Sequence, residues 1–261
     1  MQQLWNRFQK SPSAAADLTA TDVGESQDDV QGRLGMFLLV DKPSDAKGIV
    51  DIIALHGLNG HPTEIWTAYA KETRLNWLKD LLPTAIPNAR IMSYGYESSV
   101  QFSKSTADIA TFAEDLLAEI MSWRMDEEKK ARPIIFICHS LGGIVFKQAL
   151  VKARERDRFT ELLKKIRGVA FFGTPHAGSS LAKFGNIMAS IIKLSTLGTT
   201  TNARVVAVLK NNSETLWGIA RSFVDRRKAL PIVSFYETRE MAYLNSLVGG
   251  IEPERKYEID H

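Results

Sequence analysis

The sequence predicts an α/β fold with a mostly parallel central sheet and helices on both faces. Short apolar runs alternate with helix-length segments, which is the pattern of strand–helix–strand units. The apolar runs consist mainly of Val, Ile, Phe and Leu, as expected for strands buried on both faces. Of the 261 residues, 44% are hydrophobic and 24% are charged, which is ordinary for a globular chain with a sizeable core. We expect a flexible polar leader over 1–33 and one α/β domain over 34–261.

The elements of the first half follow in order. The leader is rich in Ser, Ala and Asp and is too polar to form a packed core. The segments MFLLVD (36–41) and GIVDIIALHG (48–57) predict two strands, joined by a loop of turn-forming residues. From 64 to 82, Trp and Leu residues recur mostly at helical spacing. We therefore expect one helix there, ended by Pro83 and Pro87.

The second half repeats the alternation of strand and helix. The buried apolar segment RPIIFICHS predicts a strand that leads directly into a helix beginning at Leu141. Strands are expected over 89–97, 132–140, 166–176 and 230–237. Helices are expected over 105–124, 141–155, 181–194 and 203–224. Charge-rich segments such as DEEKKAR mix both signs, so we interpret them as solvated helix faces.

The composition excludes several classes of function. The formal charge of +3 is too small to indicate nucleic-acid binding, although it leaves open a weak peripheral contact with anionic membranes. Cys138 is the only cysteine, which rules out an internal disulfide and a multi-cysteine zinc site and fits a reducing compartment. No apolar run approaches the ~20 residues that span a bilayer. The N-terminal segment resembles neither a secretory signal nor an acid-poor mitochondrial presequence, so we expect an intracellular, cytoplasmic protein.

The stretch FICHSLGGIV (136–145) places Ser140 between a buried strand and a helix. A turn this tight forces the serine into a strained backbone conformation and lifts its hydroxyl clear of the sheet. The residues two before and two after the serine must be small, and Cys138 and Gly142 meet this requirement. The helix N-terminus directs its free N–H groups at the same point, where His139 also lies. This pattern predicts a nucleophilic serine that attacks an acyl carbon.

The segment HGLNG (56–60) follows an earlier predicted strand and is suited to complete an oxyanion hole. An acyl-transfer intermediate needs two hydrogen-bond donors for its oxyanion. The Leu141 amide at the serine turn is the first donor that we expect, and the Leu58 amide is the second. Gly57 allows the backbone to approach the substrate closely. His56 would line the site in a structural role, since the catalytic base is expected later in the chain.

The acid and the base are expected after the serine, because hydrolases of this architecture follow the order serine, acid, histidine. Glu237 ends the last predicted strand, and His261 is the only histidine after it. Asp260 and Glu258 remain alternatives for the acid. His176, in the segment GTPHAGS, could be the base by residue type, although we prefer a role in bracing the loop beside the site.

Five ordered blocks of the sequence resemble one group of α/β-hydrolases. The blocks are DIIALHGLNGHPTEIWT, NWLKDLLPTAIPNARIMSYGYE, RPIIFICHSLGGIVFKQAL, GVAFFGTPHAGS and IVSFYE. The group comprises the lipase/esterase-like domains at the N-termini of fungal NACHT/ankyrin-type, NLR-like proteins. These domains are similar to the serine-active-site-containing protein family and, more distantly, to GPI-inositol deacylases. The resemblance covers about 35–261 and implies an α/β-hydrolase fold with Ser140 as nucleophile, His261 as base and an acid near Glu237.

In such relatives the chain continues beyond the histidine, so the resemblance implies either a natural short form or a truncated domain. The overall prediction is a serine esterase or lipase that acts on an ester or lipid substrate and needs neither a cofactor nor a metal. One alternative keeps this machinery but acts on a thioester or an amide. The other is a catalytically idle α/β-hydrolase fold that serves as a signalling or effector module. The sequence identifies no protein partner.

Overall fold

The computed structural model describes residues 34–42, 47–70, 73–98, 106–176, 181, 184–188, 191, 203–227 and 230–235. The predicted leader over 1–33 lies outside the described residues. So do four residues considered for the acid and the base: Glu237, Glu258, Asp260 and His261.

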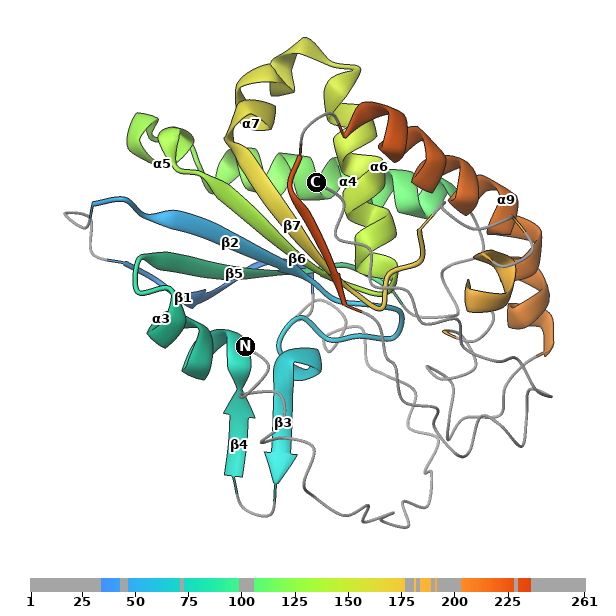
Figure 1. The fold of residues 1–261 in the computed structure, drawn as a ribbon, viewed down its shortest axis with the longest axis horizontal. Helices are drawn as coiled ribbons and strands as arrows, with labels where there is room; N and C mark the ends of the chain where they lie inside the picture. The colour runs from blue at the N-terminus through green and yellow to red at the C-terminus, as the bar shows by residue number, and fades with distance from the viewer. Residues whose placement is uncertain are drawn as a thin grey trace.

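Six of the described strands form one sheet (Figure 1). They are β1 (Gly35–Val40), β2 (Val50–Leu55), β5 (Ala89–Gly95), β6 (Ile134–His139), β7 (Ile166–Phe172) and β8 (Ile232–Phe235). The strand order is β1-β5-β2-β6-β7-β8. β1 pairs with β5 in antiparallel fashion, and each of the other neighbouring pairs is parallel. The mostly parallel sheet and the α/β-hydrolase fold predicted from the sequence are confirmed.

Both faces of the sheet are covered (Figure 1). One face packs against the long helices α4 (Thr106–Ser122), α6 (Leu141–Arg154) and α9 (Ala203–Arg226). The other face carries a smaller hydrophobic cluster. Strand β2 contributes apolar side chains to both faces of the sheet. Ile53 belongs to the cluster on the first face, and its neighbour Ile52 belongs to the cluster on the second face. Successive side chains of a strand point to opposite faces, so a continuous apolar run is required here.

Among the other described elements are four short helical segments. They are α3 (Leu82–Ala85), α5 (Glu127–Ala131), η3 (Asp157–Phe159) and α7 (Thr160–Lys165). The charge-rich segment before β6 forms α5, which has no buried residues. Its lysines make exposed ion pairs three residues apart, Lys129 with Asp126 and Lys130 with Glu127. The interpretation of DEEKKAR as a solvated helix face is therefore confirmed for α5, but Arg132, the last residue of the segment, is buried.

The single helix predicted from 64 to 82 is wrong. The segment contains the 3-10 turn η1 (Glu64–Trp66), a hairpin of β3 (Thr67–Ala70) and β4 (Thr73–Asn76), and the π-helical turn η2 (Trp77–Leu81). The hairpin projects from the body of the molecule (Figure 1). The tryptophans and leucines still reach a core, because Trp66 and Leu78 are buried against the second face of the sheet.

Local chemistry explains the break in this helix. Thr67 and Tyr69 favour strand conformation, and the Asn76 side chain accepts a hydrogen bond from the Lys79 backbone N–H, which starts a new helical turn after the hairpin. Pro83 lies in the first turn of α3, where a missing N–H has no consequence. It therefore begins a helix instead of ending one.

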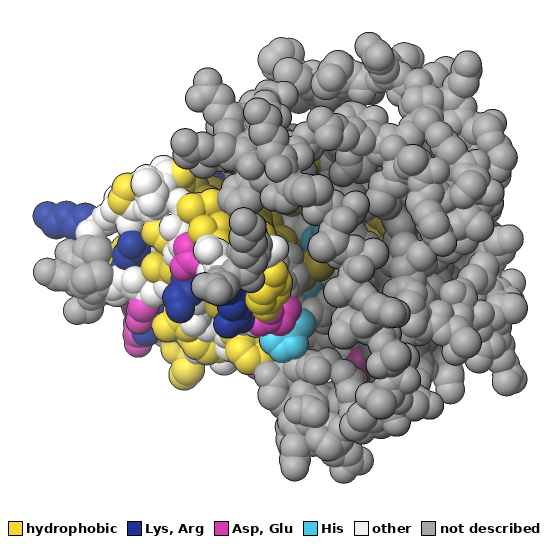
Figure 2. Space-filling view, turned by 90° about the horizontal axis from the view of Figure 1, so that it is seen from below, with side chains coloured by type: hydrophobic (Ala, Val, Ile, Leu, Met, Phe, Trp, Pro, Cys, Tyr) yellow, Lys and Arg dark blue, Asp and Glu magenta, His cyan; other side chains and the backbone are white. Residues whose placement is uncertain are grey.

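The underside of the molecule mixes apolar and charged side chains. Figure 2 shows hydrophobic side chains there together with Lys, Arg, Asp and Glu on the described surface. Ile65 and Tyr69, at and beside the hairpin, are exposed. Within the described ranges, no helix has both the length and the hydrophobicity to cross a membrane. The peripheral membrane contact considered from the net charge stays a prediction.

Candidate active site

Ser140 forms the turn between β6 and α6. Its backbone has φ 51° and ψ −117°, and among the described residues other than glycine only Asn59 shares a positive φ. Such a conformation is unfavourable for an L-residue and persists only when the surrounding structure enforces it. The Ser140 N–H donates a hydrogen bond of 2.8 Å to the Phe172 carbonyl at the end of β7, and the Thr174 hydroxyl donates one of 3.1 Å to the Ser140 carbonyl. The strained turn predicted from the sequence is present.

The residues around this turn are small because α6 crosses the neighbouring backbone at contact distance. A Cβ atom on Gly142 would lie 2.4 Å from the His56 carbonyl oxygen and 2.7 Å from that of Leu55. A Cβ on Gly143 would lie 2.3 Å from side-chain atoms of Thr174. Cys138 is fully buried beneath the serine, and burial raises the pKa of its thiol well above its ordinary value. The Cys138 thiol is thus a packing group at this site.

The Ser140 hydroxyl is buried but unpaired. Its oxygen has no hydrogen-bond partner within the described part of the chain, although buried polar groups are nearly always paired. It stands at the N-terminus of α6, where the free N–H groups and the helix dipole favour negative charge. A hydroxyl kept without a partner at such a point is suited to become an alkoxide-like nucleophile.

The HGLNG loop lies directly against Ser140. A Cβ on Gly57 would come within 2.9 Å of the Ser140 Cβ and 2.8 Å of the His139 Nδ1. The loop is fixed by two hydrogen bonds, from the Asn59 N–H to the Ser98 carbonyl and from the Gly60 N–H to the Gly57 carbonyl. Neither the Leu58 amide nor the Leu141 amide makes a hydrogen bond with the residues that the structure describes. Within the part of the chain that the structure describes, both N–H groups are without an acceptor.

His56 braces this loop from inside the protein. Its ring stacks on Tyr96 with centroids 4.3 Å apart, and its two nitrogens contact the Gly57 carbonyl at 2.9 Å and the Tyr96 N–H at 3.3 Å. Burial is the main cause that lowers the pKa of His56 to about 4. A neutral ring that donates to Gly57 and accepts from Tyr96 satisfies both contacts, which fits the structural role expected for His56.

The pKa of His56 predicts a loss of stability in acid. The folded-state pKa of about 4 lies below the ordinary value of 6.5, so the unfolded chain binds the proton more readily. The contribution of His56 is complete above pH 6.5 and decreases as the pH falls toward 4, by about 3 kcal/mol at most. Urea unfolding at pH 8, 6 and 5 should show this decrease. The His56→Gln variant should show a shallower dependence, and an unchanged slope would contradict the assignment.

His139 and His176 are both half-buried, and this partial burial is the main cause that lowers the pKa of each. The pKa of His176 falls to about 3. Its Nε2 lies 3.3 Å from the Ser234 hydroxyl, and its ring meets Phe171 edge to face at 5.0 Å. These contacts tie the loop after β7 to β8, in keeping with the bracing role expected for His176. His139 faces Trp66 edge to face at 6.5 Å.

Sequence reasoning missed two residues that hold the site together. Thr174 bonds the Ser140 carbonyl and packs against Gly143. Lys147 is buried on α6, and its amine donates a 2.6 Å hydrogen bond to the Pro175 carbonyl. Its burial lowers the pKa of Lys147 to about 7. Helical spacing gave a usable signal, because Lys147 is three residues after the buried Ile144 and therefore lies on the inward face of α6.

The structure describes four of the five histidines of the sequence, and none of these four bonds the Ser140 hydroxyl. The fifth is His261, which lies outside the described residues together with Glu237. Within the described ranges, no cluster of three or more His, Cys, Asp and Glu side chains could hold a metal ion. The described part of the site thus contains the serine, the strained turn and two unused amides.

Comparison with known proteins adds a family model described as "Putative serine esterase (DUF676)", which matches residues 49–216. Protein SERAC1 of mouse is 27% identical over 188 residues, which cover 65% of this chain and 27% of that protein. Human Protein SERAC1 is 26% identical over 152 residues, which cover 51% of this chain and 23% of that protein. The chain thus matches only a minor part of the length of these relatives. Among solved structures, the lipase BlEst2 of Bacillus licheniformis is 19% identical with a TM-score of 0.47, covering 76% of this chain and 70% of that one.

Proposed function

Because the chain belongs to the "Putative serine esterase (DUF676)" family, we propose that it cleaves carboxylic esters through an acyl-enzyme on Ser140. The observation that carries this proposal is the state of Ser140 itself. Its backbone is held at φ 51°, and its hydroxyl has no partner within the described residues and lies at the N-terminus of α6. Strain of this kind is a functional signal when it coincides with a reactive group.

The first step is attack of the Ser140 oxygen on the ester carbonyl carbon. His261 takes the hydroxyl proton as general base, and Glu237 orients the imidazole, with Asp260 as the alternative acid. The carbonyl π electrons move to the oxygen and form a tetrahedral oxyanion. Four of the five histidines have other contacts or no bond to Ser140, which supports His261 as the base.

The second step is collapse of the tetrahedral intermediate. The Leu58 and Leu141 N–H groups donate to the oxyanion until the carbon–oxygen bond to the alcohol breaks. The protonated histidine gives its proton to the leaving alcohol, and the acyl group stays on Ser140. A water molecule then attacks the acyl-enzyme by the same route and releases the acid. The lack of an acceptor for either amide among the described residues supports their assignment to the oxyanion.

We propose an ester with an apolar acyl group, such as a lipid. The support is a row of aromatic rings that starts next to the serine. Phe172, whose carbonyl accepts from the Ser140 N–H, stacks on Phe235 at 4.6 Å and meets Trp77 at 6.2 Å. A single buried free thiol, Cys138, supports an intracellular, cytoplasmic site of action.

The second candidate is a catalytically idle hydrolase fold that acts as a signalling or effector module, as in the fungal NLR-like proteins that the sequence resembles. The observation that favours it is the lack of a histidine bonded to Ser140 within the described residues. The two candidates differ in one measurable property, which is the reactivity of the Ser140 hydroxyl.

Labelling with a fluorophosphonate tests the proposal. The wild-type chain should react covalently, since the probe phosphorus is attacked as an ester carbon would be, and Ser140→Ala should not react. Cys138→Ala is the matched control from the same turn and should label like the wild type. Peptide mapping should place the modification on Ser140. An unlabelled wild-type chain would favour the idle module, and labelling that survives in Ser140→Ala would exclude Ser140.

A further inference from the structure

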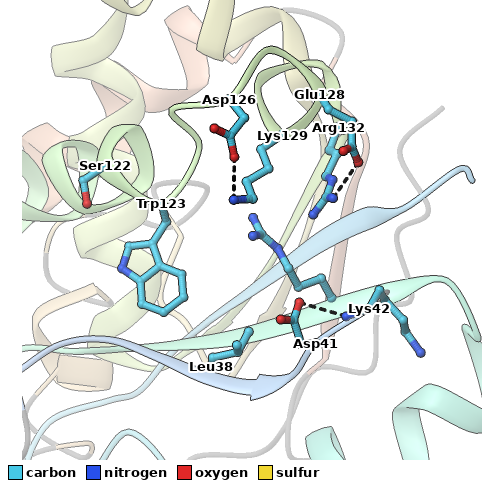
Figure 3. Close-up of a pocket in the computed structure, with 10 residues that line it drawn as sticks. Leu38, Asp41, Lys42, Ser122, Trp123, Asp126, Glu128, Lys129 and Arg132 are labelled. Atoms are coloured by element: carbon cyan, nitrogen blue, oxygen red, sulfur yellow. Dashed lines mark hydrogen bonds and ion pairs between the residues drawn. The ribbon is translucent and has the colours of Figure 1, made fainter. Parts of the chain in front are cut away.

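A pocket lies at the end of the sheet where the parallel strands begin, and Ser140 lies at the other end. It has a volume of about 600 Å³ and opens beside the segment that leads into β6. Ten residues line it (Figure 3): Leu38, Asp41, Lys42, Arg90, Ser122, Trp123, Asp126, Glu128, Lys129 and Arg132. Strand β6 runs from this end to Ser140, a distance of about 20 Å at ~3.3 Å per residue. The pocket is therefore separate from the candidate active site.

The charged floor of the pocket is the cluster of Asp51, Arg90, Arg124 and Arg132, of which Arg90 and Arg132 line the cavity. This cluster has an excess of buried positive charge. Asp51 is fully buried and pairs with Arg90 through two hydrogen bonds of 2.8 and 2.9 Å. Arg124 also bonds Asp51, and the Arg132 guanidinium lies 4.0 Å from it. All three arginines are buried, so three guanidinium groups share one buried carboxylate. A desolvated charge that lacks a counter-ion is unfavourable, which makes this floor attractive to an anion.

Two further observations indicate that positive charge exceeds negative charge in the pocket floor. The Nε atom of Arg132 is buried without a hydrogen-bond partner in the part of the chain that the structure describes. The pKa of Arg124 is lowered, mainly by burial, and the charges of Arg90 and Arg132 contribute to the shift although Asp51 opposes it. One carboxylate therefore does not balance these arginines.

The acidic residues of the pocket are on its rim. Glu128 bonds Arg132 at 2.7 Å and Asp126 bonds Lys129 at 2.6 Å, and the two carboxylate side chains are 58% and 65% exposed. Asp41 is exposed as well and accepts from the Lys42 backbone N–H. Exposed ion pairs contribute little free energy. An entering anion can therefore replace Glu128 and Asp126 as the partner of Arg132 and Lys129.

The pocket also has an apolar wall. Trp123 is half-buried, and Leu38 is 41% exposed although it is a large hydrophobic residue. Figure 3 shows Trp123 and Leu38 on one side of the pocket, while the charged ends of Lys129 and Arg132 lie on the other. A ligand with an anionic head and a small apolar body would meet both.

We propose that this pocket binds a phosphate monoester, with the phosphate against Lys129 and Arg132 and its apolar group on Trp123 and Leu38. The oxygens of a phosphate group can accept two parallel hydrogen bonds from the planar guanidinium of an arginine. The negative charge of the phosphate would balance the excess positive charge of the pocket floor. The pocket is independent of the ester-cleaving site, so Ser140→Ala should bind the same ligand with unchanged affinity.

Isothermal titration calorimetry with phenyl phosphate tests the proposal on the 261-residue chain. Lys129→Gln should weaken binding by roughly tenfold, the loss expected for one charge-assisted hydrogen bond. Lys130→Gln is the matched control, because Lys130 neighbours Lys129 in α5 and makes the same kind of ion pair but does not line the pocket. Its affinity should equal that of the wild type. Asp126→Asn combined with Glu128→Gln should bind more tightly, since it removes the competing carboxylates.

Two further ligands test the parts of the site. Inorganic phosphate should bind more weakly than phenyl phosphate, and equal affinities would contradict the apolar wall. Short-chain phosphatidic acid tests whether the phosphate belongs to a lipid. A lipid source is indicated if this ligand binds the wild type more tightly than phenyl phosphate does and binds Lys129→Gln less well than the wild type. The proposal is overturned if phenyl phosphate does not bind, if Lys129→Gln and Lys130→Gln behave alike, or if Ser140→Ala abolishes binding.

Discussion

Replacing Ser140 by alanine should lower kcat/KM for a soluble p-nitrophenyl ester by roughly 10⁴-fold or more, as expected when a nucleophile that acts with a base and an oxyanion hole is removed. The fold should be unaffected. The Ser140 oxygen makes no hydrogen bond with the described residues, and alanine keeps the Cβ that contacts the HGLNG loop. Initial rates and thermal unfolding of both chains check the two halves of this expectation.

The decisive control comes from the same turn. Cys138→Ala removes the neighbouring thiol, which burial makes unreactive, and should retain most of the wild-type rate. The chain also contains buried serines away from the turn, such as Ser93, whose hydroxyl bonds the Pro62 carbonyl at 2.5 Å and is not available for attack. A Ser140→Ala variant with more than about a tenth of the wild-type rate would be incompatible with the large loss expected for a nucleophile.

The turn at Ser140 was predictable from the sequence because its causes are local. A buried strand, a serine and two glycines are contiguous, and the strain follows from a reversal within one residue. The sequence does not show which distant strand lies against helix α6. The structure identifies it as β2, because Gly142 lies against the carbonyls of Leu55 and His56. The antiparallel direction of β1 could not be predicted from the sequence either, because an apolar run predicts a strand but not its orientation.

The charged floor of the pocket was not predictable, because its partners meet only in the tertiary structure. Arg90 lies beside Asp51 through the register of β5 on β2, and Arg124 reaches Asp51 from the turn after α4. Arg90 and Asp51 are 39 positions apart, and Arg124 and Asp51 are 73 positions apart. The hairpin over 67–76 was missed for a different reason. Trp66 and Leu78 reach one core from two turns on either side of a hairpin, and their spacing alone looks like that of one helix.

Gly142→Ala should destabilise the fold by about 3 kcal/mol, at the upper end of the usual range for overpacking. The new Cβ would come within 2.4 Å of the His56 carbonyl and 2.7 Å of the Leu55 carbonyl, and both are backbone atoms that cannot rotate away. Strand β2 cannot retreat either, because it is hydrogen-bonded to β5 on one side and β6 on the other. For a chain of this size the midpoint of thermal unfolding should fall by roughly 6 to 12 °C.

Gly218→Ala is the matched control for this substitution. Gly218 lies in α9, and a Cβ there would meet nothing within 4 Å. Alanine is the better helix former, so this variant should be stabilised by about 0.5–1 kcal/mol. The two substitutions add the same methyl group to helical glycines, and they should change stability in opposite directions. If Gly142→Ala were as stable as the wild type, α6 could not be in backbone contact with β2. The HGLNG loop that follows β2 would then not be held against Ser140 by that contact.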